Sequence, residues 1–166
     1  KSIDTKANRG CIFFIGNGAS ASMAGHFAAD ISKNAGIKTR IFTETSLIKA
    51  LANDISYEEI FAEPIRWYMT QHDILVAISS SGNSPNIVTA VAAANKLGGM
   101  TVTLSALKED NAIRKMGHIN LYVKAPTYGL AESAHATILH HWTDNLEEEH
   151  IHLKNHGPDS EVITIK

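Results

Sequence analysis

Short apolar runs alternate with segments of helical periodicity along the whole chain. Apolar runs bounded by glycine or polar residues are typical of buried strands, whereas apolar residues three and four positions apart are typical of helices. Strands are predicted at residues 11–15, 39–43, 73–78, 100–104 and 119–123. Helices are predicted at residues 20–35, 47–52, 57–69, 84–97, 111–116 and 132–148. This order predicts a three-layer α/β/α fold, in which helices cover both faces of a mostly parallel sheet.

Several residues mark the expected helix ends. Gly36 is a C-terminal stop for the first long helix. Ser84 is a good N-cap, and Pro85 is well placed in the first turn of the helix that follows. Pro64 is expected to kink or bound the helix at 57–69.

The chain is expected to form a single domain over residues 1–149, with no low-complexity linker and no short repeat. Residues 150–166 have weaker patterning and carry His150, His152 and His156. We interpret this segment as a tail that packs on the domain or on a neighbouring subunit, with an edge strand at 161–165.

The composition of the 166 residues excludes several classes of function. A hydrophobic fraction of 44% and a charged fraction of 19% are ordinary for a soluble globular protein. The net charge of −2 offers no basic footprint, so neither nucleic acid nor a membrane surface is expected as a direct partner. No apolar stretch is long enough to span a bilayer, and no secretory signal opens the sequence. With Cys11 as the single cysteine, we expect a cytoplasmic protein.

A serine-rich turn follows the predicted strand at 73–78. It comprises Ser79, Ser80, Ser81, Gly82, Asn83 and Ser84. Small residues let backbone N–H groups approach an anion, hydroxyls add donors, and the helix that begins at Ser84 points its free N–H groups at the same place. A capped turn without a ligand is the alternative, but this set of residues after a buried strand favours an anion site.

A second small-residue loop, Gly16 to Ser20, follows the first strand. It is not a dinucleotide fingerprint, because Ala21 stands where the third glycine would be. Only Glu44 could act as the acidic residue after the second strand. No nucleotide cofactor is expected.

Taken together, these loops make the chain resemble the sugar isomerase (SIS) domains, and phosphoheptose isomerases in particular. The resemblance covers most of residues 10–146, and the pairing of its two loops is more specific than either motif alone. Its matching segments are GNGASASMAGHFAADI (16–31), Asn53-Asp54, AISSSGNSPNIVTAVAAANKLG (77–98) and Gly129-Leu130-Ala131-Glu132.

This resemblance implies a flavodoxin-like parallel sheet and a homo-oligomer, a tetramer or a dimer, with sites at subunit interfaces. The implied reaction is the aldose–ketose isomerisation of a phosphorylated sugar such as sedoheptulose 7-phosphate, which needs a base and an acid. The implied substrate contacts lie in the two loops and in the Asn53-Asp54 pair. They are Asn17, Gly18, Ser20, Asp54, Ser79, Ser80, Ser81 and Ser84.

The family's first helix also carries a His-x-x-x-Glu pair, which is His26 and Asp30 in this chain. Spacing of four residues places both side chains on one helical face, where they could hold a divalent metal, with zinc favoured. Asp30 would be both catalytic base and ligand. The ordinary reading of such a pair is a surface hydrogen bond.

In the last helix the family has Gln and, eight residues later, His. Alignment on Gly129–Glu132 puts His135 at the Gln position, as a third metal ligand and catalytic residue, and Thr143 at the His position. Thr143 cannot act as an acid near neutral pH. His140 and His141 are weaker candidates, because helical geometry points them away from the face of His135.

Two functions follow. One is a sugar-phosphate isomerase, which could be metal-assisted. It could also act on another phosphorylated sugar, with the catalytic roles reassigned among His26, Asp30 and the histidines of the last helix. The other, suggested by Thr143, is a non-catalytic module that binds sugar phosphates or protein partners, as in the replication initiator-associating member of the same family.

Overall fold

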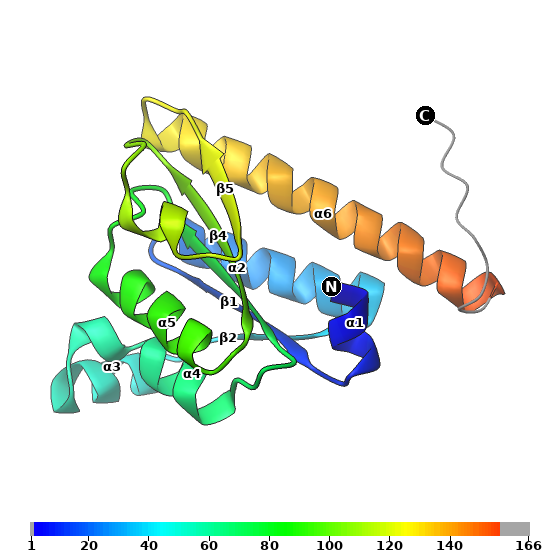
Figure 1. The fold of residues 1–166 in the computed structure, drawn as a ribbon, viewed down its shortest axis with the longest axis horizontal. Helices are drawn as coiled ribbons and strands as arrows, with labels where there is room; N and C mark the ends of the chain where they lie inside the picture. The colour runs from blue at the N-terminus through cyan, green and yellow to red at the C-terminus, as the bar shows by residue number, and fades with distance from the viewer. Residues whose placement is uncertain (1, 157–166) are drawn as a thin grey trace.

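The computed structural model describes residues 2–156 and confirms the α/β architecture (Figure 1). The strands are β1 (Cys11–Gly16), β2 (Lys38–Ile41), β3 (Ile74–Ser79), β4 (Met100–Ala106) and β5 (Ile119–Val123). The α-helices are α1 (Ser2–Ala7), α2 (Ala19–Asp30), α3 (Thr45–Asp54), α4 (Ala62–Tyr68), α5 (Pro85–Lys96) and α6 (Tyr128–His156). Short turns of other helix types are η1 (Ile31–Ala35), η2 (Tyr57–Glu59) and η3 (Ala112–Lys115).

The five strands form one sheet in the order β2-β1-β3-β4-β5, and every neighbouring pair is parallel. This is the flavodoxin-like order, in which the chain first winds to one side of β1 and then to the other. Ligands in such sheets bind beyond the carboxyl ends of the strands, near the point where the winding reverses. Here that point lies between β1 and β3, the strands that precede the two small-residue loops.

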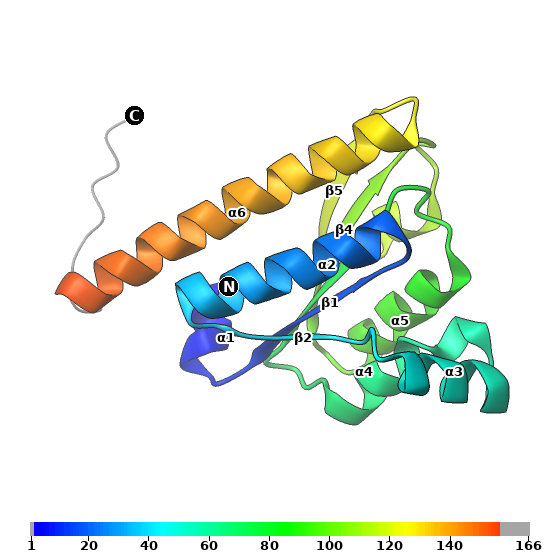
Figure 2. The same cartoon turned by 180° about the vertical axis from the view of Figure 1, so that it is seen from behind.

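Alternate residues of β1 point into opposite layers. Phe13 and Ile15 pack into a core built with residues of α3, α4 and α5. Ile12 and Phe14 pack into a second core, to which α2 contributes Phe27 and α6 contributes residues such as Leu139. Figures 1 and 2 show α2 and α6 together on one side of the sheet and α3, α4 and α5 on the other. The three-layer arrangement follows from the strand period of two.

The last helix is longer than predicted at both ends. It begins at Tyr128 and runs to His156, so the first seven residues of the expected tail are helical. After Gly129 the sequence has no glycine or proline before Gly157, so nothing in it interrupts the helix. Lys6 Nζ also lies 2.8 Å from His150 Nδ1 and ties the helix to α1. The predicted edge strand at 161–165 lies outside the described residues.

Two other segments differ from the prediction in detail. The segment predicted as one helix at 57–69 is split into η2 and α4, and Pro64 falls in the first turn of α4, where its missing N–H costs no hydrogen bond. The long helix that ends before Gly36 is α-helical to Asp30 and π-helical over Ile31–Ala35. Among residues 2–156, no helix has the length and hydropathy needed to cross a membrane.

Candidate active site

A pocket of about 130 Å³ lies at the carboxyl ends of β1 and β3. It is closed by the first turns of α2 and α6 and by the serine turn before α5. Its lining residues are Asn17, Ser20, Ile78, Ser79, Ser80, Ser81, Ser84, Tyr128 and Glu132. The structure therefore brings both predicted loops together around one small polar cavity. Six of the eight predicted substrate-binding residues line it.

The serine turn is held in shape by its glycine. Gly82 has a φ of +65°, and its N–H donates to Ser79 O at 2.9 Å. A Cβ at Gly82 would collide with the buried side chain of Asn111, so both the backbone conformation and the space demand glycine. The side chain of Ser84 makes no capping bond to α5 and lies 3.4 Å from Ser79 Oγ. Hydroxyl groups and the start of α5 thus face the same cavity.

Ser80 adds an unusual feature to this turn. Its side chain is buried, and Ser80 Oγ has no hydrogen-bond partner among the described residues. A buried hydroxyl without a partner costs free energy, on the order of 1–3 kcal/mol. A ligand oxygen in the pocket that Ser80 lines would remove that cost.

A pair of amides joins the two loops. Asn17 Nδ2 donates to Asn86 Oδ1 at 3.0 Å, and Asn86 Nδ2 donates back to Asn17 Oδ1 at 3.0 Å. Asn86 lies in the first turn of α5 and is only 2% exposed. Gly18, at φ +54°, allows the chain to turn from Asn17 into α2 and does not itself line the pocket. Sequence reasoning missed Asn86, although it follows directly on the Ser84-Pro85 helix start.

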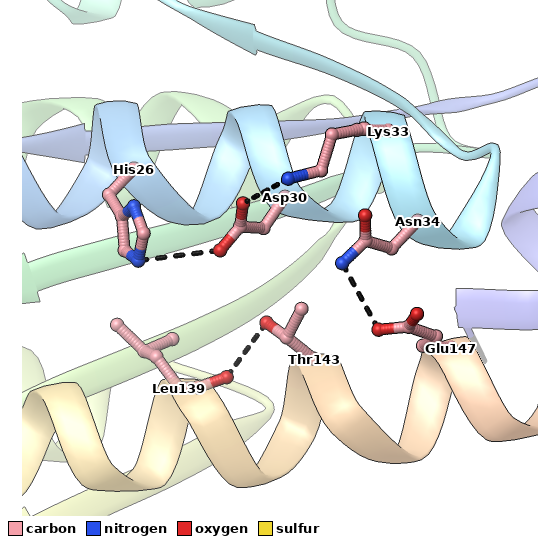
Figure 3. A network of polar contacts seen from close by, with 7 residues as sticks. All are labelled: His26, Asp30, Lys33, Asn34, Leu139, Thr143 and Glu147. Atoms are coloured by element: carbon pink, nitrogen blue, oxygen red, sulfur yellow. Dashed lines mark hydrogen bonds and ion pairs between the residues drawn. The ribbon is translucent and has the colours of Figure 1, made fainter.

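A second polar cluster lies between α2 and α6. His26 Nε2 is 3.3 Å from Asp30 Oδ2, and Lys33 Nζ is 3.4 Å from Asp30 Oδ1 (Figure 3). The ring of His140 on α6 lies 5.5 Å from the ring of His26 and 4.8 Å from that of Phe27, centroid to centroid. The structure therefore places His140, not His135, beside the His26–Asp30 pair.

The structure packs His135 in the core against β4. Its side chain is fully buried, and His135 Nε2 lies 3.2 Å from the carbonyl oxygen of Ser105 in β4. Burial lowers the pKa of His135, although the hydrogen bond to Ser105 acts in the opposite direction. His135 is a core histidine, and it does not line the serine pocket.

Thr143 is also buried, and its hydroxyl donates to Leu139 O at 2.9 Å within α6 (Figure 3). Glu132 lines the serine pocket, and His140, eight positions later on α6, lies beside His26.

The proposed metal ligands do not come together. Within residues 2–156, no group of three His, Cys, Asp or Glu side chains is arranged to hold a metal ion. His26 and Asp30 are paired with each other, while His135 is bound to Ser105. The donor set of the single chain therefore does not fit the predicted zinc.

Asp54 lies apart from the pocket. It ends α3 on the opposite side of the sheet from α2, is exposed, and accepts a hydrogen bond from Asn53 Nδ2 at 2.8 Å. Asp54 does not line the serine pocket, so the structure does not bring this predicted residue to the other substrate-binding residues.

The serine pocket and the histidine cluster are separate in one chain. His26 lies six residues after Ser20 on α2, which is about 9 Å of helix. His140 lies eight residues after Glu132 on α6, which is about 12 Å. The two helices thus carry two half-sites, one at their common start and one further along.

A parallel sheet in this order, with a hydroxyl-lined turn at its carboxyl edge, defines a doubly wound α/β domain built to bind an anionic ligand. Residues 2–106 match the SIS domain family, and the chain belongs to that family.

Curated relatives include the phosphoheptose isomerases of Helicobacter pylori (strain P12) and Syntrophotalea carbinolica. The first is 32% identical over 156 residues, 90% of this chain and 81% of the relative. The second is 33% identical over 146 residues, 84% of this chain and 74% of the relative. The structure of the phosphoheptose isomerase from Neisseria gonorrhoeae matches with a TM-score of 0.81 at 28% identity, over 87% of this chain and 81% of that one.

Proposed function

We propose that this protein is a sugar-phosphate isomerase of the phosphoheptose isomerase type, which interconverts an aldose phosphate and a ketose phosphate such as sedoheptulose 7-phosphate. The observation that carries the proposal is the hydroxyl-lined pocket at the carboxyl ends of β1 and β3. The relatives named phosphoheptose isomerase, with 81% and 74% of their length covered, support the same reaction class.

The phosphate of the substrate binds in the serine turn. Ser79, Ser80, Ser81 and Ser84 supply hydroxyl donors, and the start of α5 supplies backbone N–H groups and the positive end of the helix dipole. Asn17 and Ser20 lie at the opposite wall and meet the carbon chain next to the phosphate, and Gly18 shapes the turn between them. Glu132 cannot favour a phosphate dianion, so it accepts hydrogen bonds from sugar hydroxyls at the mouth of the pocket.

The isomerisation moves one proton between neighbouring carbons while protons exchange on their oxygens. Asp30 is the base for the carbon-bound proton. His26 orients Asp30, and His140 replaces His135 as the group that exchanges protons with the oxygens.

Asp30 works on a substrate held by another copy of the chain. It lies ten residues beyond Ser20 on α2, which is about 15 Å of helix, longer than a seven-carbon sugar phosphate can span between its phosphate and its carbonyl. A homodimer or tetramer that sets the histidine cluster of one protomer against the serine pocket of its partner removes this gap. Asp54 then completes the partner's site in the same way.

Among residues 2–156 no third donor joins His26 and Asp30 in an arrangement that could hold a metal ion, so the proposed proton transfers are assigned to side chains. We place the enzyme in the cytoplasm, since the net charge of −2 and the unpaired thiol of Cys11 fit a reducing compartment.

Turnover of sedoheptulose 7-phosphate by the wild type and by Asp30→Ala tests the proposal. We expect isomerisation by the wild type and a loss of at least a hundredfold in kcat for the variant, the scale of a removed general base. An equally active Asp30→Ala would refute the assigned chemistry.

A non-catalytic binding module is the second candidate, because the Asp30 carboxylate is engaged by both His26 and Lys33. It requires that sugar phosphates raise the melting temperature while none of them is isomerised. These two results together would favour a binding module over an enzyme as the function of the protein.

A further inference from the structure

A second cavity, of about 510 Å³, lies at the amino-terminal end of the sheet. It is formed where β1 and β2 begin, at the end of α4 and at the loop that enters β3. The strands are parallel, so this end is separated from the serine turn by the length of β1, about 20 Å. Nothing in the proposed isomerase reaction uses it. Its lining residues that matter here are Arg9, Cys11, Lys38, Arg40, Tyr68 and Asp73.

Three cations line this cavity: Arg9, Lys38 and Arg40. All three are exposed, and within residues 2–156 no ion pair joins any of them to a carboxylate. Unpaired cations that converge on one hollow raise its positive potential, because the low-dielectric walls concentrate the field. The cavity is therefore positive although the whole chain has a net charge of −2.

The one carboxylate in the lining does not offset them. Asp73 is only 5% exposed, and its oxygens are directed at the backbone. Asp73 Oδ1 accepts from the N–H of Cys11 at 2.6 Å, and Asp73 Oδ2 accepts from the N–H of Thr70 at 2.6 Å and from Thr70 Oγ1 at 2.9 Å. The cavity thus has three positive side chains and one carboxylate, and that carboxylate already accepts three hydrogen bonds.

Arg40 is held in place by an aromatic ring. Its guanidinium carbon lies 3.6 Å from the centroid of Tyr68 and 5.8 Å from that of Phe42. Stacking uses the face of the guanidinium and leaves its N–H groups, which point outward in the plane, able to bind a phosphate or carboxylate. The charges of Arg40 and Lys38 reach the cavity wall, since both act to lower the pKa of the Cys11 thiol.

Arg9 stands in a backbone conformation that favours glycine. Its φ is +58°, just after α1, where its N–H donates to Lys6 O at 3.0 Å. Glycine or asparagine is the usual residue at such a helix end, and an arginine there is under backbone strain. An arginine after a helix C-terminus also offsets the helix dipole. That effect accounts for one cation at one helix end, not for three that meet at a cavity.

We propose that this cavity binds a small organic anion with two or more negative charges, of the phosphate-ester or diphosphate class, independently of the serine turn. Such a ligand supplies negative charge opposite Arg9, Lys38 and Arg40. It can occupy the cavity while a substrate is bound at the other end of the sheet. Its position against β1 makes it a second ligand site on the same strand.

Pyrophosphate is the probe, measured through the melting temperature of the full chain at constant ionic strength. At ten times its Kd, we expect a rise of about 3–6 °C. The rise should persist in the variant Ser81→Ala/Ser84→Ala, which weakens the serine turn. It should disappear in Arg9→Gly/Lys38→Gln, in which Arg9→Gly also relieves the backbone strain. Lys96→Gln, an exposed lysine at the same end of the molecule, is the matched control for charge and should behave as the wild type.

The single cysteine gives a readout that belongs to this cavity alone. Burial first, and Asp73 second, raise the pKa of the half-buried Cys11 thiol to about 11, so alkylation by iodoacetamide is slow and is best followed at about pH 9.5. Pyrophosphate in the cavity covers the thiol and should slow alkylation at least threefold in the serine-turn variant.

Two outcomes overturn the proposal. One is a pyrophosphate shift that is lost in the serine-turn variant and kept in Arg9→Gly/Lys38→Gln, because the anion then binds only the serine turn. The other is unchanged Cys11 alkylation at pyrophosphate concentrations up to the millimolar range. A protein that does not isomerise sugar phosphates could still bind pyrophosphate in this cavity, so the two proposals are tested by separate measurements.

Discussion

The imidazole rings of His26 and His140 meet edge to face between α2 and α6, with centroids 5.5 Å apart and planes inclined by 65°. His26 Nε2 lies 3.3 Å from the carboxylate of Asp30, so three side chains able to carry protons lie in one cluster. The proposed isomerase reaction rests on this cluster.

His140→Gln is expected to lower kcat by at least a hundredfold, since it removes a group that exchanges protons with the substrate oxygens. His141→Gln is the matched control, because His141 is the neighbouring histidine on α6, is exposed, and has its ring 3.3 Å from Asn145 Nδ2. Equal losses for both variants would contradict the role of His140.

Subunit complementation tests whether Asp30 acts on a partner's substrate. Asp30→Asn and Ser81→Ala/Ser84→Ala should each be inactive alone. Mixed after dissociation and reassembly, they should recover about a quarter of wild-type activity, since half of random dimers are hybrids and each hybrid has one intact site of two. No recovery, with hybrids shown to form by mass spectrometry, would mean that Asp30 and the serine turn act within one chain.

Gly82→Ala is expected to destabilise the fold by about 2–4 kcal/mol and to abolish phosphate binding, because it combines a positive φ with a collision against Asn111. Urea denaturation and phosphate titration measure the two effects. Gly129→Ala is the control: a Cβ there meets nothing within 4 Å, so its stability should be unchanged or raised by up to about 1 kcal/mol. A fully stable Gly82→Ala would refute this account of the turn.

The stability of the fold should decrease as the pH falls below about 6.5. Burial lowers the pKa of His135 in the folded state. As the pH falls, the unfolded chain therefore takes up the proton first, which lowers the free energy of the unfolded state relative to the folded state. The contribution is complete above the unfolded pKa, and it is lost as the pH falls from there to the lowered pKa of the folded state. Urea midpoints between pH 8 and 5 should show this slope in the wild type and in His72→Gln, which alters an exposed histidine. A His135→Gln variant that keeps the full slope would show that other groups cause it.

The strands and the serine turn were predictable, because an apolar run such as residues 73–78 is a local signal and the turn follows directly on it. The roles of His135 and His140 were not. The position of each histidine depends on how α6 packs against β4 and α2, and the local pattern of the helix does not encode that packing. The extension of α6 to His156 was not predicted, because the weak hydrophobic pattern after residue 149 was taken to mean that the helix had ended. No glycine or proline interrupts the helix there.

The amide pair of Asn17 and Asn86 has one more consequence. Neither side chain gains or loses a proton between pH 2 and pH 12, so the tie between the two walls of the pocket is the same in acid and in base. The tie that joins the two walls of the anion site is therefore insensitive to pH. Binding of a phosphate measured against pH should accordingly follow the charge state of the ligand.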